Sequence, residues 1–342
     1  MSTAPHKVEA LLDDARAEIA VTDQELTEAR DRRNRIKKAL KKAFPASTTY
    51  DCGSVAHGDA NTPLKDVDTG VVVAGAEEDY GPGGDGPRPL MNGARDGIRE
   101  ELESDYPNLR IAVEGQTHAV GVSFGDPVDL DENDFTADVI VTVDNTDSAG
   151  IYIPDLPTDG WEPSHPAEHT RLMKQGNRAT GSVLARTVRL LKYWNGHHGS
   201  PLCSWNIKVL ALKSITKKVP LAQALLAFFE HAAKSLRDGL TDDPAGVSDP
   251  IELNLPLEGV LERVDDARDL IEQAINAEDE GRPYLAQHKL AALLPEIVPD
   301  ADADDLRREE INQQKAHEAA DQSRGVGTGS SLLIPSTRGW SD

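Results

Sequence analysis

The chain has 342 residues, enough for two lobes that each bury a core, and its 59 acidic against 36 basic residues give a net charge of −23. A charge of this sign and size argues against a large footprint on a nucleic-acid backbone, which needs clustered lysine and arginine. No apolar run approaches the roughly 20 residues of a membrane span, and the start of the chain lacks a signal-peptide core. We therefore expect a soluble, cytoplasmic protein without a membrane partner. The two cysteines form no C-x-x-C pair, so we expect no zinc module.

The first predicted element is a long helix over residues 5–43, in which Val8, Leu12, Ile36 and Leu40 fall near helical spacing. Within it, residues 30–38 are rich in arginine and lysine. These charges could contact an acidic partner or RNA. The favoured interpretation is a solvated face on a helix whose apolar stripe packs on the rest of the protein.

A short extended stretch over residues 47–52 leads into Gly53 and Ser54, and a turn-rich interval then leads to Asp66 and Asp68. Alternation along a strand places the two aspartates on the same side, where they repel each other unless a cation lies between them. Mg²⁺ takes such oxygen ligands and completes its shell with substrate phosphates. Because the Gly-Ser turn offers backbone N–H groups and a hydroxyl to phosphate, the two features together, with Gly58 between them, predict nucleotide chemistry.

An apolar strand over residues 135–143 contains one acid, Asp138. A lone buried carboxylate is costly unless it is paired or binds metal, so Asp138 is predicted to be the third metal ligand. Asp129, Asp131 and Asp144 are alternatives, but they lie in or beside turn-like sequence, where aspartate is common. The elements between the motif and this strand are a Gly- and Pro-rich loop, a helix and a hairpin, over residues 75–89, 91–104 and 110–124.

The second half of the chain is predicted to be helical, over residues 167–178, 181–195, 205–215, 219–237, 256–278 and 286–294. In the second of these helices, Arg186, Arg189 and Lys192 form a basic row at three-residue steps. Such a row could be an ordinary solvated face, but it stands out in so acidic a chain. His165 and His169 have a spacing that zinc ligands can show. Because a proline separates them and no acid completes the set, hydrogen-bonding histidines at a helix start are favoured.

These elements divide the chain into four parts: an N-terminal helix over residues 1–45, a catalytic lobe over 46–160, a helical lobe over 161–300 and a tail over 301–342. The tail turns acidic and polar, and residues 324–331 have the composition of a linker. We therefore expect it to be flexible.

Gly53-Ser54, Gly58 and Asp66-Val67-Asp68 together resemble the signature of the polymerase-beta-like nucleotidyltransferases. The strand around Asp138, the stretch 161–170 and the R-x-x-R-L-L-K-x-W-N sequence over residues 186–195 narrow the resemblance to the bacterial relatives of cyclic GMP-AMP synthase and oligoadenylate synthase. These DncV-like CD-NTases act in anti-phage (CBASS) signalling. The resemblance implies an α+β fold, with a nucleotidyltransferase sheet lobe and a helical lobe linked by a long N-terminal spine helix.

The resemblance also implies the roles of the site residues. Two Mg²⁺ or Mn²⁺ ions would be held by Asp66, Asp68 and Asp138. Nucleotide binding would fall to Gly53, Ser54, Lys192, Ser204 and Trp205, with Lys192 on the triphosphate, Ser204 on a phosphate and Trp205 stacked on the donor base. From the residues alone, Ser204 could be only a helix N-cap, and Trp205 could be only a core residue.

The implied reaction joins nucleoside triphosphates into a cyclic di- or trinucleotide second messenger. We expect a monomer, and the acidic charge of the chain argues against a stable nucleic-acid partner. In some family members a protein encoded nearby binds the tail. Two other interpretations stay open at this point. One is a nucleic-acid-directed transferase, such as a CCA-adding enzyme or an oligoadenylate synthase, and the other is a protein-modifying or antitoxin-like nucleotidyltransferase. The Gly-rich loop over residues 75–89 departs from the family pattern.

Overall fold

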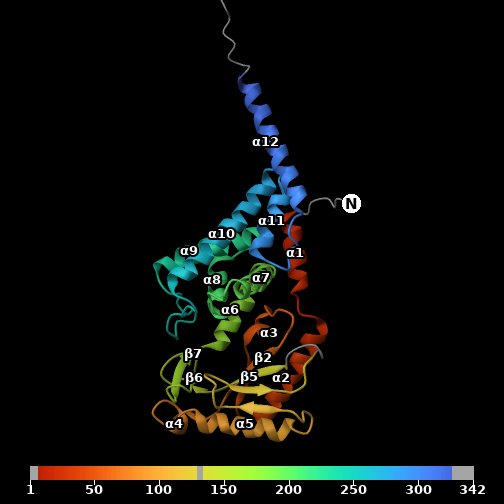
Figure 1. Cartoon of the computed structure of the whole chain (residues 1–342). Helices are drawn as coiled ribbons and strands as arrows, with labels where there is room; N and C mark the ends of the chain where they lie inside the picture. Colours follow the sequence, from red (N-terminus) through yellow and green to blue (C-terminus); the bar gives the residue numbers. More distant parts are fainter. Residues whose placement is uncertain (1–6, 129–133, 326–342) are drawn as a thin grey trace, which may run out of the picture.

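The computed structural model describes residues 7–128 and 134–325, and in this range the chain folds into a sheet lobe and a helical lobe (Figure 1). The strands are β1 (Thr48–Asp51), β2 (Asp66–Val72), β3 (Arg110–Ala112), β4 (Val120–Ser123), β5 (Thr136–Asp144), β6 (Ile151–Asp155) and β7 (Gly160–Ser164). The helices packed with them are α2 (Asp23–Ala43), α3 (Gly53–His57), α4 (Glu77–Tyr80) and α5 (Arg88–Leu102). The helical lobe comprises α1 (Val8–Glu18), α6 (Pro166–Ala179), α7 (Val183–His197), α8 (Ser204–Ser214), α9 (Leu221–Asp238), α10 (Leu257–Asp279), α11 (Pro283–Leu293) and α12 (Ala303–Gly325).

Within the described residues, the strands form one seven-stranded mixed sheet in the order β1-β2-β5-β4-β3, with β6 paired to β5 and β7 to β6. The neighbours β2 and β5 run parallel, and their register sets Asp68 opposite Asp138. The predicted hairpin is present as the antiparallel pair β3 and β4. Because residues opposite each other in neighbouring strands face the same side of a sheet, Asp68 and Asp138 share a face.

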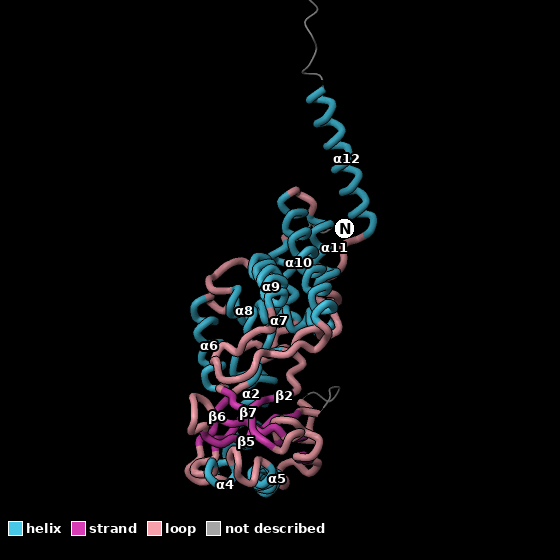
Figure 2. Tube along the Cα trace, turned by 90° about the vertical axis from the view of Figure 1, so that its left-hand side faces the viewer, coloured by secondary structure: helices cyan, strands magenta, loops and turns pink. Residues whose placement is uncertain are grey.

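The other face of the sheet builds the core of its lobe. Val67, Val71, Val139 and Val141 are buried, in the same cluster as apolar residues of α2 and α5. Burial of this apolar surface favours the fold by roughly 25 cal/mol per Å². Figures 1 and 2 show α5 beneath the sheet and the helical lobe on the opposite side. Figure 1 shows α3 between the sheet and that lobe. The aspartate-bearing face of the sheet is therefore turned toward the helical lobe.

The predicted single helix over residues 5–43 is wrong, because the structure contains two helices there. Helix α1 packs into the core of the helical lobe, whereas α2 packs into the core of the sheet lobe. Helix α1 ends at Glu18, and Thr22 caps the start of α2. The Thr22 side chain accepts a hydrogen bond from Glu25 N, and the Glu25 side chain accepts one from Thr22 N. This capping box fixes a helix start at Asp23, so the link between the lobes is two helices and a short turn.

Two further differences concern residues without a strong local pattern. Residues 151–164 form the β6–β7 hairpin, which the sequence did not predict. Part of the expected tail is helical, because α12 covers Ala303–Gly325 and projects away from the helical lobe (Figure 1). Residues 326–342 of that tail lie outside the described residues, as do Asp129 and Asp131. Among the described helices, none has the length and apolar character needed to cross a membrane.

The basic run on α2 is paired with acidic residues of the same chain. Lys37 Nζ lies 2.9 Å from Asp51 Oδ1. Lys42, on the same helix beyond the run, has its Nζ 2.7 Å from Glu100 Oε1 on α5. Further pairs of the run are Arg33–Asp51, Arg35–Asp105 and Lys38–Glu101. Several cations of the run are thus paired within the chain, which weighs against the alternative of an acidic partner or RNA.

Candidate active site

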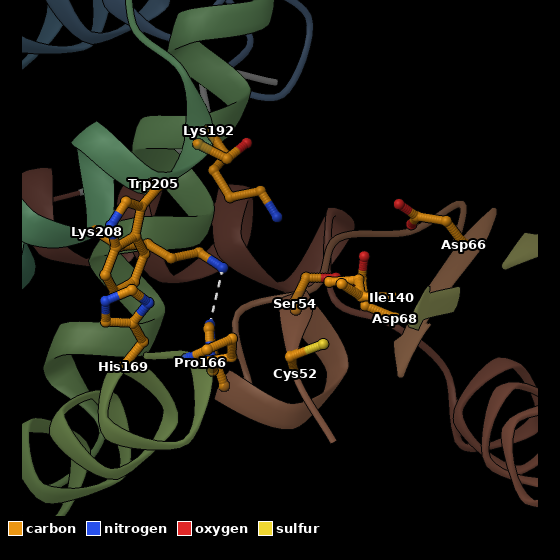
Figure 3. A pocket seen from close by; sticks show the side chains of 13 residues that line it. Cys52, Ser54, Asp66, Asp68, Ile140, Pro166, His169, Lys192, Trp205 and Lys208 are labelled. Carbon is orange, nitrogen blue, oxygen red and sulfur yellow. Dashed lines mark hydrogen bonds between the residues drawn. The ribbon is translucent and has the colours of Figure 1, made fainter. Parts of the chain in front are cut away.

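A cavity of about 500 Å³ lies where the two lobes meet (Figure 3). The sheet lobe contributes the predicted residues Gly53, Ser54, Asp66 and Asp68, and the helical lobe contributes Lys192, Ser204 and Trp205. Figure 3 shows Lys192, Trp205 and Lys208 across the cavity from Asp66 and Asp68. The structure thus brings together the aspartate pair and every residue predicted to bind the nucleotide.

The electrostatics of the sheet side are set by carboxylates that crowd one another. Burial, followed by repulsion from Asp66 and Asp138, raises the pKa of Asp68 to about 6, and this rise is limited by Lys208 and Lys192. Partial loss of hydration beside the surrounding protein, followed by repulsion from Asp66, raises the pKa of Asp138 as well. Carboxylates in this state gain stability when a cation approaches them.

Asp138 is exposed, so the prediction that it is a lone buried carboxylate is wrong. Its neighbours Ala137 and Val139 are buried, because they point to the opposite face of the sheet. The position of Asp138 beside the site follows instead from the register of β5 against β2. The alternative Asp144 ends the same strand and lines a separate groove with Glu77.

Gly53 allows the first turn of α3 to lie directly against Asp68. Its φ of +70° is in the left-handed region that side chains rarely adopt. A Cβ atom at this position would lie only 1.6 Å from Asp68 Oδ2. The Gly-Ser turn is therefore in contact with the aspartate pair, as a joint site for phosphate and metal requires.

Two lysines of the helical lobe converge on one buried acid of the sheet lobe. Lys208 Nζ lies 3.1 Å from Asp59 Oδ1, and Lys192 Nζ lies 3.7 Å from the same oxygen. Lys208 Nζ also contacts His57 Nδ1 at 3.1 Å, and His57 Nε2 contacts Thr170 Oγ1 at 3.1 Å. Burial, followed by the charge of Lys208, lowers the pKa of His57 to about 3, so this imidazole is neutral and accepts the hydrogen bond from Lys208.

Trp205 both packs on the core of its lobe and lines the cavity. Its ring centroid lies 4.3 Å from that of His169, with 37° between the planes. His169 is held in turn by Asp243, whose Oδ1 lies 2.7 Å from His169 Nε2. The two interpretations of Trp205, as a core residue and as a platform for a base, are compatible in this arrangement.

Two other sequence interpretations are settled by helix starts. Ser204 is not the N-cap of α8, because Cys203 occupies that position and its Sγ accepts from Asn206 N. Ser204 is exposed and lines the cavity. His165 is the N-cap of α6, where its Nδ1 accepts from Glu168 N. This agrees with the predicted role of the histidine at a helix start.

The donor set on the sheet side fits a divalent cation. Asp66, Asp68 and Asp138 supply the carboxylate oxygens that Mg²⁺ prefers, and the raised pKa of Asp68 shows that these groups already interact. In the ranges that the structure describes, no three His, Cys, Asp or Glu side chains converge closely enough to hold a metal ion. Binding a cation would therefore require these side chains to turn toward one another.

Sequence reasoning missed His57, Asp59, Lys208 and His169, all of which line the cavity or support its lysines. For Lys208 a signal was present, because it stands one helical turn after Ser204 and so faces the same side of α8. For Asp59 the sequence offered no comparable signal. An aspartate after a glycine reads as a turn residue, and its lysine partners lie far along the chain.

No protein-family profile and no curated protein matches the chain. Solved structures do match, and three bacterial proteins are among them. E. coli MS115-1 CdnC, solved with ATP, is similar over 86% of this chain and 99% of its own, with a TM-score of 0.61 and 17% identity. The Vibrio cholerae DncV cyclic AMP-GMP synthase is similar over 86% of this chain and 97% of its own, with a TM-score of 0.64 and 13% identity. The Bradyrhizobium diazoefficiens CD-NTase CdnG, solved with GTP, is similar over 84% of this chain and 98% of its own, with a TM-score of 0.60 and 12% identity.

The fold class is therefore that of a nucleotidyltransferase, with a mixed sheet lobe and a helical lobe as the sequence predicted. More narrowly, the chain has the fold of the CD-NTases over most of its length.

Proposed function

We propose that this protein is a nucleotidyltransferase that joins nucleoside triphosphates into a cyclic di- or trinucleotide. The observation that carries the proposal is the cavity between the lobes, in which an aspartate pair faces lysines, a serine and a tryptophan. Acidic groups suited to metal and basic groups suited to phosphate lie on opposite walls. This arrangement fits a nucleoside triphosphate whose α-phosphate is attacked near the aspartates.

The residues of the chain have separable roles in this proposal. Asp66, Asp68 and Asp138 would hold two Mg²⁺ or Mn²⁺ ions, which when bound would acidify an attacking ribose hydroxyl and neutralise the leaving pyrophosphate. Lys192 and Lys208 would donate hydrogen bonds to phosphate oxygens, as charge-assisted pairs.

The remaining lining residues would orient the donor nucleotide. Ser54 and the start of α3 lie beside Asp68, where a hydroxyl and backbone N–H groups can bind a phosphate oxygen. Ser204 offers a second hydroxyl from the helical lobe. Trp205, braced by His169, would stack on the base, a contact worth about 1–3 kcal/mol. Similarity to proteins solved with ATP or GTP supports nucleotide substrates.

The test is to incubate the purified protein with all four labelled nucleoside triphosphates and Mg²⁺ or Mn²⁺, then to treat with phosphatase and identify products by mass spectrometry. We expect a phosphatase-resistant cyclic oligonucleotide with wild type. The Asp66→Asn/Asp68→Asn variant should yield none, because the metal ligands are lost. Absence of product with wild type, also after addition of RNA, DNA or cell lysate, would contradict the proposal.

We further propose that the product acts in anti-phage signalling, on the strength of the resemblance to CD-NTases. The E. coli CdnC was also solved in a complex with HORMA-deltaN, which supports a search for a regulatory partner encoded nearby. Expression of the protein with its neighbouring genes should reduce phage plaque counts, and the Asp66→Asn/Asp68→Asn variant should not. Equal protection by both would separate the defence role from nucleotide synthesis.

A further inference from the structure

Asp59 is a buried acid at the junction of the lobes whose surroundings call for an explanation. Its exposed fraction is 0%, and it follows α3 in the sheet lobe. Neither of its carboxylate oxygens has a hydrogen-bond partner among the described residues, although two lysine ammonium groups lie near them. A buried carboxylate needs cations or hydrogen bonds to compensate its lost hydration, and the nearby Lys192 and Lys208 supply positive charge to Asp59.

The two lysines face the cavity, and Asp59 lies behind them. Lys192 and Lys208 are among the residues that line the cavity, whereas Asp59 is not. The carboxylate therefore does not occupy space that a nucleotide would fill. Its negative charge reaches the cavity only past two ammonium groups, so it is poorly placed to compete with a phosphate.

Each lysine is also held by a second contact that directs its ammonium group. Lys192 Nζ donates a hydrogen bond to the main-chain oxygen of Asp59 at 3.2 Å. Lys208 Nζ contacts the neutral His57 at 3.1 Å. An ammonium group has three N–H donors, and these contacts leave donors for a ligand in the cavity.

Without a counter-ion the ammonium groups of Lys192 and Lys208 would repel each other. Burial, and to a smaller extent the charge of Lys208, lowers the pKa of Lys192, and Asp59 acts in the opposite direction. Two like charges in a partly desolvated site either lose a proton or move apart. Both outcomes would weaken a site for a polyanion.

We propose that Asp59 is a positioning residue, which holds Lys192 and Lys208 side by side so that both bind the triphosphate of the donor nucleotide. The inference rests on the proposed function, because it assigns the triphosphate subsite of that same cavity. Because Asp59 belongs to the sheet lobe and both lysines belong to the helical lobe, this contact also sets the subsite relative to the aspartate pair.

The test is isothermal titration of the full-length protein, with Mg²⁺, using two probes. One is an ATP analogue with a methylene group between the α- and β-phosphorus atoms, which cannot be turned over, and the other is inorganic triphosphate. The Asp59→Asn variant keeps the shape of the side chain and removes its charge. We expect its Kd to rise about tenfold or more for both probes, since both bind through the lysines.

The matched control is Asp265→Asn on the helical lobe. Asp265 also bridges two cations, Arg237 and Arg268, but lies outside the cavity. Its Kd values should equal those of wild type. In turnover assays, Asp59→Asn should raise the KM for the triphosphate by the same factor as the Kd, with kcat changed less than about threefold. A purely structural role would not produce this split.

A further pair of variants tests the inference if Asp59→Asn does not fold. Lys208→Met and Lys208→Met/Asp59→Asn differ only in the acid, and the double variant lacks both members of the closest ion pair. We expect the double variant to bind triphosphate about tenfold more weakly than the single one, because Lys192 has lost its counter-ion. Equal binding within this pair would overturn the inference.

The remaining outcomes are distinct. If wild type binds both probes and Asp59→Asn binds them equally well or more tightly, Asp59 does not position the lysines and the inference fails. If wild type binds neither probe, the proposed function fails and the inference fails with it.

Discussion

Asp68 is destabilising at neutral pH while the site holds no cation. Its pKa is raised from 3.8 to about 6, so the folded protein binds a proton at this group more tightly than the unfolded chain does. The cost of ionising Asp68 in the fold is therefore fully present above pH 6 and absent below pH 3.8. Carboxylates in this state are typical of functional sites, where they are kept for their ligand.

Replacing Asp68 by asparagine should consequently stabilise the protein in a metal-free buffer at pH 7.5. The expected gain is up to about 3 kcal/mol in the free energy of unfolding, and it should shrink as the pH falls from 6 to 4. Chemical denaturation at both pH values measures it. Asp144→Asn, an exposed position at the end of β5, is the control and should change little at either pH. An equal gain for Asp68→Asn at pH 4 and pH 7.5 would contradict the argument.

Gly53 and Gly58 form a matched pair for the contact between α3 and the aspartates. Both have positive φ, +70° and +77°, but only a Cβ at Gly53 meets another group, Asp68 Oδ2. Either change to alanine costs about 1 kcal/mol of backbone strain. Gly53→Ala should in addition displace Asp68 and lower nucleotidyl transfer about a hundredfold or more, whereas Gly58→Ala should be far milder. Similar rates for the two variants would exclude a special role for the close approach at Gly53.

Among contacts between elements, Glu25 joins the start of α2 to the loop that precedes β2 and Asp66. Its Oε2 accepts from Thr22 N at 2.7 Å, and its Oε1 accepts from Thr62 Oγ1 and Leu64 N, each at 2.7 Å. Burial opposes the charge, but the hydrogen bonds outweigh it and lower the pKa of Glu25. The start of α2 and the approach to β2 are therefore fixed by one carboxylate.

Glu25→Ala should lower the free energy of unfolding by about 3 kcal/mol, because buried N–H donors lose their acceptor. Asp31→Ala, at an exposed position on the same helix, should change it by less than about 0.5 kcal/mol. Urea denaturation of the two variants and wild type gives both values. If Glu25→Ala lowered the free energy of unfolding no more than Asp31→Ala does, water would have replaced the hydrogen bonds of the Glu25 carboxylate.

The net charge of the whole molecule argues against a nucleic-acid partner. The chain carries a net charge of −23. Lys37 and Lys38 of the basic run on α2, and Lys42 beyond it, are paired with acids of the same lobe. A nucleic-acid backbone requires an excess of unpaired cations on one face.

We therefore expect no binding of duplex RNA or DNA at an ionic strength of about 0.15 M, and no stimulation of nucleotide synthesis by either. Fluorescence anisotropy with labelled duplexes at several salt concentrations measures the binding. A Kd that weakens steeply with salt would show a phosphate-binding face and would favour the nucleic-acid-directed alternative.

Much of the fold and the site could be read from local patterns. The alternation of Asp66, Val67 and Asp68 sets both acids on one face of a strand, and the helical stripe of residues 181–195 predicted α7 with Lys192. The break at Thr22 was also legible, since Thr22 and Glu25 have the spacing of a capping box. It was missed because apolar residues continue near helical spacing on both sides of the turn.

Short motifs in the sequence predicted the class of chemistry, because side chains a few residues apart on one strand or helix face lie close together whatever the rest of the chain does. Only the tertiary structure decided which distant residues complete the site. Asp138 lies beside Asp68 because of the parallel register of β5, and not because it is buried. His57 and Lys208 meet across 151 residues of sequence, and Asp59 becomes an anchor for two lysines only where the lobes close over it. Such contacts depend on how the two cores pack against each other, and no local periodicity encodes that packing.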